Sequence, residues 1–259
     1  MGTTPLFFGD AQKPLFGAYH APRAGTARRI GVLLCYPAPQ EYMFAHRAFR
    51  VLAETLSEKG FPVLRFDYSG TGDSSGDLDT VTFGGWRADV ATAADELREL
   101  GAVSQLSIVG MRLGASIAAT VAAEGHRFKD LVLWDPIVDG SRAIAELRAI
   151  DHQRLAMSHV KREARADELC GFAFPSHLRR ELGRLNLLEL PQVAASRVSI
   201  LSSAEDPDCV SLYERLVAAG NDASLRVVSD PESIEKRASL GESLLSRKLI
   251  DAVVERIVS

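Results

Sequence analysis

The 259-residue chain has few cysteines and no long apolar run, and each shortage excludes a class of protein. Its three cysteines, Cys35, Cys170 and Cys209, are odd in number and widely spaced, which excludes a disulfide framework and a Cys-rich zinc site. No apolar stretch is long enough to span a bilayer, and the N-terminus has no charged-then-apolar signal pattern. We therefore expect a reducing, cytoplasmic compartment.

The charge balance excludes two further classes. With 30 Lys and Arg against 34 Asp and Glu, the net charge is -4, so the chain lacks the basic surface of a nucleic-acid-binding protein. With 46% hydrophobic residues, it is too apolar to be disordered. No ligand spacing such as His-Glu-x-x-His occurs, so we expect neither a metal nor an organic cofactor. The expected partner is a small-molecule ligand, and no oligomeric state is predicted.

Short apolar runs alternate with helical patterns along most of the chain. An opening hairpin is predicted from two runs bounded by turn residues, 6–8 and 15–19. Strands are predicted at 30–35, 61–66, 106–110, 131–134, 198–201 and 225–228, and the continuous apolar run at 30–35 indicates a strand buried on both faces. Helices are predicted at 43–58, 86–100, 112–123, 208–219 and 243–257. This alternation predicts an α/β protein with a mostly parallel, twisted sheet and helices on both faces.

The stretch from 140 to 190 interrupts the alternation, because it has helical patterns and no clear strand. The chain is thus predicted to form a core from 1–138 and 191–259, with a helical cap or lid inserted at 139–190. From 141 to 185 the insertion has nine Lys and Arg and six Asp and Glu. This net positive charge suits a lid over an anionic ligand. Its apolar segment 172–175 either lines an acyl pocket or packs on the core.

The most informative segment is Gly110-Met111-Arg112-Leu113-Gly114, which joins a predicted strand to a predicted helix. Small residues at its two ends permit a sharp turn. Such a turn places Arg112 at the top of the sheet and at a helix N-terminus, where ligands of α/β sheets bind.

This turn, the loop Arg65-Phe66-Asp67-Tyr68 to Gly72-Asp73-Ser74, and Asp135-Pro136 before the insertion resemble α/β-hydrolase-fold proteins. The resemblance is to the serine-aminopeptidase-like branch that includes exosortase-associated hydrolases, and it covers nearly the whole chain in element order. It implies an α/β-hydrolase fold in which the central residue of the turn is a nucleophilic serine.

The triad that this resemblance implies is incomplete here. Position 112 is arginine, which stays protonated and cannot attack a carbonyl. Asp206 or Asp208 could supply the acid of the triad. The histidine is expected in 229–243, but this region has no histidine, because all six histidines of the chain lie at or before His177. Ordinary serine hydrolysis is therefore not expected.

Arg112 has two possible roles. It is either an anchor for an anionic group of a ligand, or one half of an internal salt bridge with Glu41, Asp206 or Asp208. The expected ligand-binding residues are Arg112, Met111, Leu113, Tyr36, Glu41, Arg47 and Asp208.

The resemblance also implies that the loop after residue 35 supplies oxyanion N–H groups, which prolines 37 and 39 limit to Tyr36 or Ala38. The catalytic candidates are Cys35, His46 and Asp206. Cys35 is either a thiol nucleophile with His46 as its base or a core residue that continues an apolar run.

Three functions follow from these patterns. The first is a hydrolase-fold protein with a lidded pocket for an acyl or carboxylate-bearing small molecule, any catalysis being free of the usual triad. The second is a non-catalytic binding or accessory protein that kept the fold and filled its active site. The third is thiol-dependent acyl transfer or hydrolysis at Cys35.

Overall fold

The computed structural model describes residues 2–23, 25, 27–157, 165–229 and 246–259. Its core is an eight-stranded sheet in the order β1-β2-β4-β3-β5-β6-β9-β10. These strands are β1 (Thr3–Asp10), β2 (Lys13–His20), β3 (Ile30–Cys35), β4 (Val63–Phe66), β5 (Gln105–Met111), β6 (Phe128–Trp134), β9 (Ala195–Ser202) and β10 (Ala223–Val227).

The strand directions match the predicted mostly parallel sheet. β1 and β2 form an antiparallel hairpin, and β2 pairs antiparallel with β4. From β4 to β10 every neighbouring pair is parallel. The carboxyl ends of β3, β5 and β6 consequently lie along one edge of the sheet, which is the edge where α/β proteins bind ligands.

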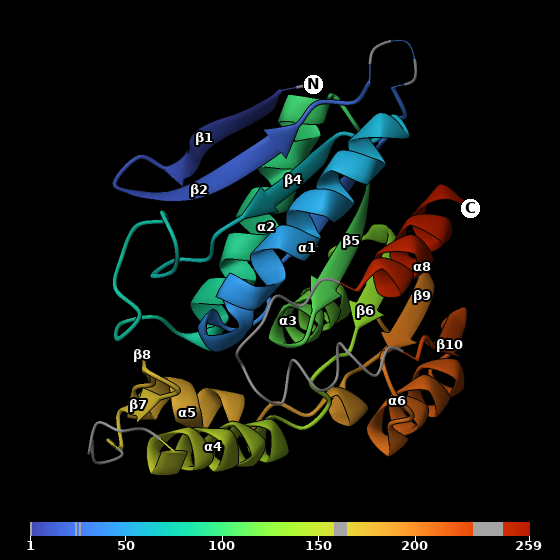
Figure 1. Cartoon of the computed structure of the whole chain (residues 1–259). Helices are drawn as coiled ribbons and strands as arrows, with labels where there is room; N and C mark the ends of the chain where they lie inside the picture. Colours follow the sequence, from blue (N-terminus) through green and yellow to red (C-terminus); the bar gives the residue numbers. More distant parts are fainter. Residues whose placement is uncertain (1, 24, 26, 158–164, 230–245) are drawn as a thin grey trace.

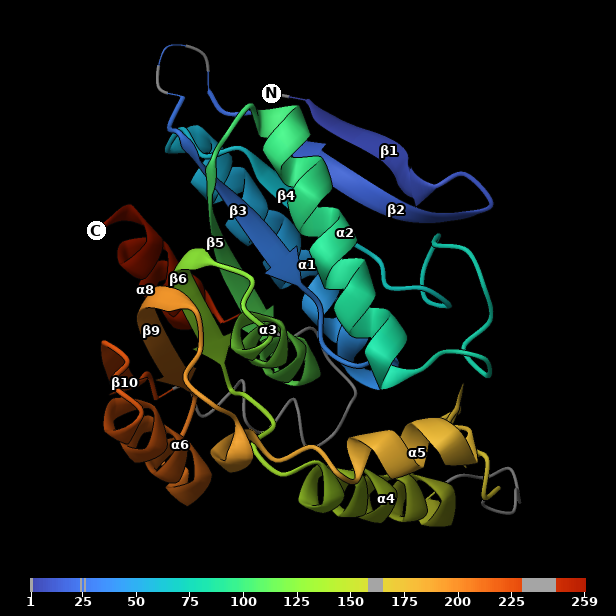
Figure 2. The same cartoon turned by 180° about the vertical axis from the view of Figure 1, so that it is seen from behind.

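Helices cover both faces of the sheet, as predicted (Figures 1 and 2). On one face α1 (Pro39–Glu58) packs beside α8 (Arg247–Val258), and on the other α2 (Phe83–Gly101) packs beside α3 (Leu113–Ala123). α6 (Pro207–Ala218) packs against β9 and β10. α3 is buried almost all round because it is rich in alanine, which lets it approach the sheet closely.

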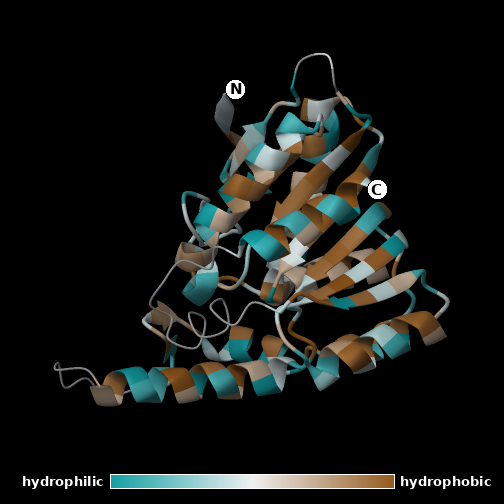
Figure 3. Ribbon diagram, turned by 45° about the vertical axis from the view of Figure 1, so that its right-hand side comes forward, coloured by the Kyte–Doolittle hydropathy of each residue, from teal (hydrophilic) through white to brown (hydrophobic). Residues whose placement is uncertain are grey.

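The segment between β6 and β9 lies beyond the carboxyl ends of the strands (Figure 1). Its elements are α4 (Gly140–Met157), β7 (Glu168–Leu169), β8 (Phe172–Ala173), α5 (Ser176–Leu182) and the 3₁₀ helix η1 (Leu187–Glu189). We call residues 139–190 the inserted segment. Its two ends lie side by side, since the Gly140 N–H donates to the Leu185 carbonyl at 2.9 Å and Asp139 bridges Asn186. Figure 3 shows apolar and polar residues mixed along α4, whereas the central strands of the sheet are largely apolar.

Several details differ from the sequence-based prediction. The expectation of no strand in 140–190 is wrong, because β7 and β8 form a two-stranded hairpin. α1 begins at Pro39 rather than near residue 43, since proline is well accommodated in a first helical turn. The final helix is described from Arg247, and its predicted start at 243 lies outside the described residues.

Candidate functional site

The turn between β5 and α3 has the sharp geometry expected of it. Arg112 has φ 52° and ψ -118°, a strained conformation for a residue with a side chain. Its N–H donates to the Trp134 carbonyl of β6 at 2.9 Å, which fixes the turn to the sheet. A Cβ atom at Gly110 would collide with the Gly114 carbonyl, and one at Gly114 with the Cys35 and Tyr36 carbonyls. Both glycines are therefore required by close backbone packing.

The Arg112 side chain is held by Glu41 from the first turn of α1. Its Nε donates to Glu41 Oε1 at 3.0 Å, and the two side chains are 20% and 6% exposed. The other carboxylate oxygen, Oε2, is buried and has no hydrogen-bond partner among the described residues. Of the three partners that the sequence allows for a salt bridge, the structure pairs Arg112 with Glu41.

Carboxylates dominate the electrostatics around Arg112. Burial lowers its pKa, but Glu41, Asp135 and Glu146 more than offset this effect, and the net pKa lies above its usual value. A cavity of about 80 Å³ beside Arg112 is lined by two arginines and four acids, besides four uncharged residues. The charged residues are Arg112, Arg142, Asp139, Glu146, Asp206 and Asp208. This surplus of negative charge does not favour an anionic ligand at Arg112.

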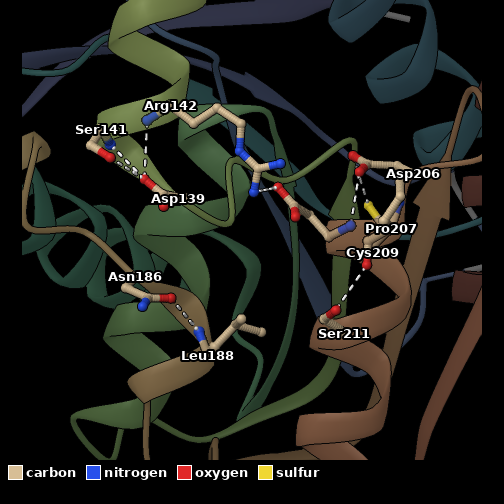
Figure 4. Close-up of polar contacts among 10 residues, drawn as sticks. Asp139, Ser141, Arg142, Asn186, Leu188, Asp206, Pro207, Cys209 and Ser211 are labelled. Atoms are coloured by element: carbon tan, nitrogen blue, oxygen red, sulfur yellow. Dashed lines mark hydrogen bonds and ion pairs between the residues drawn. The ribbon is translucent and has the colours of Figure 1, made fainter.

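The two acids predicted after β9 have structural partners (Figure 4). Asp206 is the N-cap of α6, where its Oδ1 accepts the Asp208 N–H at 2.9 Å and its Oδ2 lies 3.7 Å from Cys209 Sγ. Asp208 forms an ion pair with Arg142, which extends from α4 toward α6. Together these contacts connect the inserted segment to the start of α6.

Asp135 is a site residue that sequence reasoning missed. It follows β6 directly, has a positive φ of 44° and is 7% exposed. Its Oδ1 accepts hydrogen bonds from the Ser203 N–H at 2.7 Å and the Ser203 hydroxyl at 3.0 Å. Asp135 and Arg112 are thus two strained residues at the ends of neighbouring strands, an arrangement that is typical of functional sites. Its position at a strand end before a proline was the available signal.

Cys35 lies inside the sheet, with none of its surface exposed. Burial raises the pKa of its thiol to about 12, against a smaller opposite effect of the neighbouring Tyr68. A nucleophilic cysteine needs an accessible thiolate, and this environment supplies neither the access nor the charge. The structure therefore counts against the proposed thiol chemistry.

Tyr36 follows β3, whereas His46 and Arg47 lie on α1. Tyr36 is buried, and its hydroxyl accepts a hydrogen bond from Arg65 at 3.0 Å. The His46 ring stacks on Tyr36 with the ring centres 6.1 Å apart, while Arg47 is exposed on α1. Partial burial lowers the pKa of His46, as does Arg65. Tyr42, in the first turn of α1, contacts the Tyr36 and His46 rings at 4.7 and 5.8 Å between ring centres, so these two rings pack against the turn that carries Glu41.

A separate apolar cavity adjoins the turn. Met111 is buried in the sheet, whereas Leu113 lines this cavity of about 30 Å³ together with Ala38 and residues of α4 and α5. Gln40 is its one polar lining side chain; the other lining residues are Ile137, Gly140, Ala143, Ile144, Leu147, Leu169, Phe174, Leu182 and Leu185. A cavity of this size holds about one water molecule.

No group of three or more His, Cys, Asp or Glu side chains in the described part of the chain is arranged to hold a metal ion. No described helix combines the length and apolarity needed to cross a membrane.

Comparison with known proteins found a family model and a short sequence match. The model described as serine aminopeptidase, S33, matches residues 45–215. The palmitoyl-protein thioesterase ABHD10, mitochondrial, of Bos taurus is 44% identical over 48 residues. That match spans 18% of this chain and 16% of the bovine protein.

Solved structures match the whole chain. The mouse alpha/beta hydrolase domain-containing protein 10 has a TM-score of 0.63 at 19% identity, covering 98% of both chains. Est1E from Butyrivibrio proteoclasticus, bound to ferulic acid, has a TM-score of 0.66 at 14% identity, covering 98% of this chain and 96% of its own. An esterase from Pyrococcus furiosus has a TM-score of 0.67 at 15% identity, covering 99% of this chain and 89% of its own. At these identities the likeness establishes the α/β-hydrolase fold that the sequence predicts.

Proposed function

The chain belongs to the serine aminopeptidase S33 family, and on that premise we propose that it binds an acyl-bearing small molecule without forming an acyl-enzyme. The binding site is the apolar cavity between the Arg112 turn and the inserted segment. Residues 139–190 act as a lid over this site, and 1–138 with 191–259 form the hydrolase core.

The pairing of Arg112 with Glu41 is the observation that carries this proposal. Arginine stands where the family places a serine, and its guanidinium is held by a buried carboxylate. A guanidinium in this state neither attacks a carbonyl nor is free to polarise one. In addition, no histidine of the sequence follows His177, so the general base of the triad has no candidate in the expected region.

The character of the cavity supports an acyl ligand. Its lining is almost wholly apolar, and Leu113 places it directly beside the turn. Burying an alkyl chain there is favourable by about 0.8 kcal/mol per CH₂ group. Because the cavity holds about one water molecule when closed, a ligand enters only when α4 and α5 move away from the core. The name of the bovine relative, a palmitoyl-protein thioesterase, agrees with an acyl group as the recognised part.

The acids beside Arg112 favour a neutral ligand over a carboxylate. Four carboxylates and two arginines line the small cavity next to the turn. An ester, amide or thioester would avoid the repulsion that a free carboxylate meets there. We therefore prefer the neutral acyl derivative to the anionic ligand that the sequence also allows.

The compartment is a further part of the proposal. Three free cysteines, two of them buried, suit a reducing compartment such as the cytoplasm. The name of the bovine relative places that protein in the mitochondrion, which also keeps such thiols reduced.

One calorimetric experiment tests binding and chemistry together. The protein is titrated with the neutral, soluble thioester S-octanoyl-N-acetylcysteamine, and released thiol is measured in the same samples with a colorimetric reagent. We expect saturable binding with thiol release at the rate of the blank. Leu147→Asp, which places a charge in the cavity lining, should weaken binding at least about tenfold, whereas Val217→Asp on the exposed face of α6 should not. Equal affinity of the two variants, or absence of saturable binding, would overturn the proposal.

A further inference from the structure

A larger cavity lies on the other side of the inserted segment. Its volume is about 510 Å³, and it is bounded by the first turn of α2, by Thr120 of α3 and by α5 and η1. Figure 2 shows the start of α2 above α5. The size is within the range of about 300–1,000 Å³ that is usual for small-molecule sites. Arg112 does not line it, and Leu185 is the residue that it shares with the apolar cavity beside the turn.

Both acids of this cavity are already engaged. Glu181 Oε2 accepts the Phe83 N–H at the start of α2 at 2.7 Å. Glu189 Oε1 accepts the Asn186 side-chain amide at 3.0 Å. These carboxylates therefore satisfy groups of the protein itself, and their charge is partly compensated by those donors.

The two arginines of the cavity have side-chain N–H groups that are not used in hydrogen bonds within the described part of the chain. Arg87 lies over the Phe83 ring, 5.6 Å from its centre, and forms an ion pair with Glu124, but its Nε has no partner among the described residues. Arg184 is exposed at the cavity wall, and no ion pair or hydrogen bond joins its side chain to the described part of the chain. The guanidinium of Arg184 is thus the uncommitted charge of this cavity.

We propose that this cavity binds a small organic carboxylate with an apolar body. The planar guanidinium of Arg184 matches a carboxylate with two parallel hydrogen bonds. Phe83, Leu185 and Leu190 provide apolar surface for the rest of the ligand. Thr82 also lines the cavity; its Oγ1 accepts the Gly85 N–H at 2.9 Å, which leaves the hydroxyl proton for a ligand. Arg184 is one of the nine Lys and Arg residues that give the inserted segment its basic bias. That bias therefore serves anion binding in this cavity and not at the Arg112 turn.

This proposal does not rest on the proposed acyl site, although the two cavities share Leu185 and both are bounded by α5. Its residues lie on α2, α3 and the end of the inserted segment, and none of them contributes to the Arg112–Glu41 pair. The two sites are predicted to differ in ligand charge, since one takes a neutral acyl group and the other an anion. A variant that disables one should leave the other intact.

The test is a titration with phenylacetate and hexanoate, each compared with its neutral amide. We expect both carboxylates to saturate the protein and both amides to bind at least about tenfold more weakly. Arg184→Gln should weaken carboxylate binding by a similar factor. The matched control Arg148→Gln, an exposed arginine of α4 outside this cavity, should not change it.

The acyl-site variant Leu147→Asp serves as a second control. It should bind phenylacetate as the unaltered protein does, even if octanoyl thioester binding is lost. Equal affinities for carboxylate and amide, no effect of Arg184→Gln, or no saturable binding of either carboxylate would each overturn the proposal.

Discussion

Arg112 Nε donates to Glu41 Oε1 at 3.0 Å, although the two residues are 71 positions apart in the sequence. The pair joins the turn after β5 to the first turn of α1. In the α/β-hydrolase fold this turn is where a serine would be activated, and we propose that the pair takes that place. Since Glu41 is almost fully buried, the pair also has a measurable structural role.

A double-mutant cycle should reveal strong coupling between these residues. Arg112→Met leaves Glu41 buried without its counter-charge, and Glu41→Gln leaves the guanidinium without its hydrogen-bonded carboxylate. Each change should lower the free energy of unfolding by about 3 kcal/mol, because an unpaired buried charge is costly. The loss of free energy of unfolding in the double variant should be about 1–2 kcal/mol smaller than the sum of the losses in the two single variants. Urea denaturation gives the free energy of unfolding of the unaltered protein and the three variants. If the losses of the two single variants simply add up in the double variant, the pair has no coupling energy.

Restoring the serine should not restore hydrolysis. Arg112→Ser recreates the Gly-x-Ser-x-Gly turn, but the sequence has no histidine after His177 to activate the hydroxyl. We expect the release of 4-nitrophenol from 4-nitrophenyl butyrate to match that of Arg112→Ala within error. A rate for the serine variant that saturates with substrate and exceeds the alanine control would reveal an unrecognised base.

The Cys35 thiol should be almost inert in the folded protein. Its pKa is raised to about 12 by burial, so at pH 8 the thiolate fraction is about a thousandfold below that of an ordinary cysteine. Iodoacetamide labelling followed by peptide mapping should modify Cys35 only in denaturant. Rapid labelling of Cys35 in the native protein would revive the thiol-enzyme alternative.

His20 should make the protein less stable in mild acid. Burial, then the neighbouring Arg65, lowers its pKa from 6.5 to about 4, and Arg65 Nε donates to its Nε2 at 3.0 Å. Between these two pH values the unfolded chain binds the proton more readily than the folded one. Stability should therefore fall as pH decreases through this window, by up to about 1.4 kcal/mol per pH unit.

The control for this effect is His20→Gln, which keeps a hydrogen-bond acceptor but does not titrate. Urea midpoints at pH 7, 6 and 5 should fall more steeply for the unaltered protein than for the variant. Parallel pH profiles would contradict a neutral, buried His20.

The centre of the sheet was predictable because strands such as β3 are continuous apolar runs separated by helical patterns. Where strands extend further than predicted, as at Asp130 and Arg197, polar residues are held across the strand pair: the two are register partners, and Arg197 Nε donates to Asp130 Oδ1 at 2.7 Å. β7 and β8 were missed because two residues leave no periodic pattern. Their turn is nonetheless well defined, since Cys170 and Gly171 both have positive φ.

The site was only partly predictable. Arg112 was identified because glycines 110 and 114 force a sharp turn, a local property of the sequence. Its partner was not, because Glu41, Asp206 and Asp208 all follow strands that end at the same edge of the sheet. Packing of α1 against that edge selects Glu41. The place of Asp135 before Pro136 marks a strand end, but its partner Ser203 is 68 positions away, so the sequence could not indicate that contact.

The most direct test of the central claim is covalent labelling with a fluorophosphonate, followed by intact-protein mass spectrometry. A hydrolase with a working nucleophile reacts once and gains the mass of one phosphonate group. Since Arg112 is paired with Glu41 in place of that nucleophile, we predict an unmodified mass after incubation with excess reagent. A single stoichiometric adduct that forms on the native protein and not after heat denaturation would contradict this account.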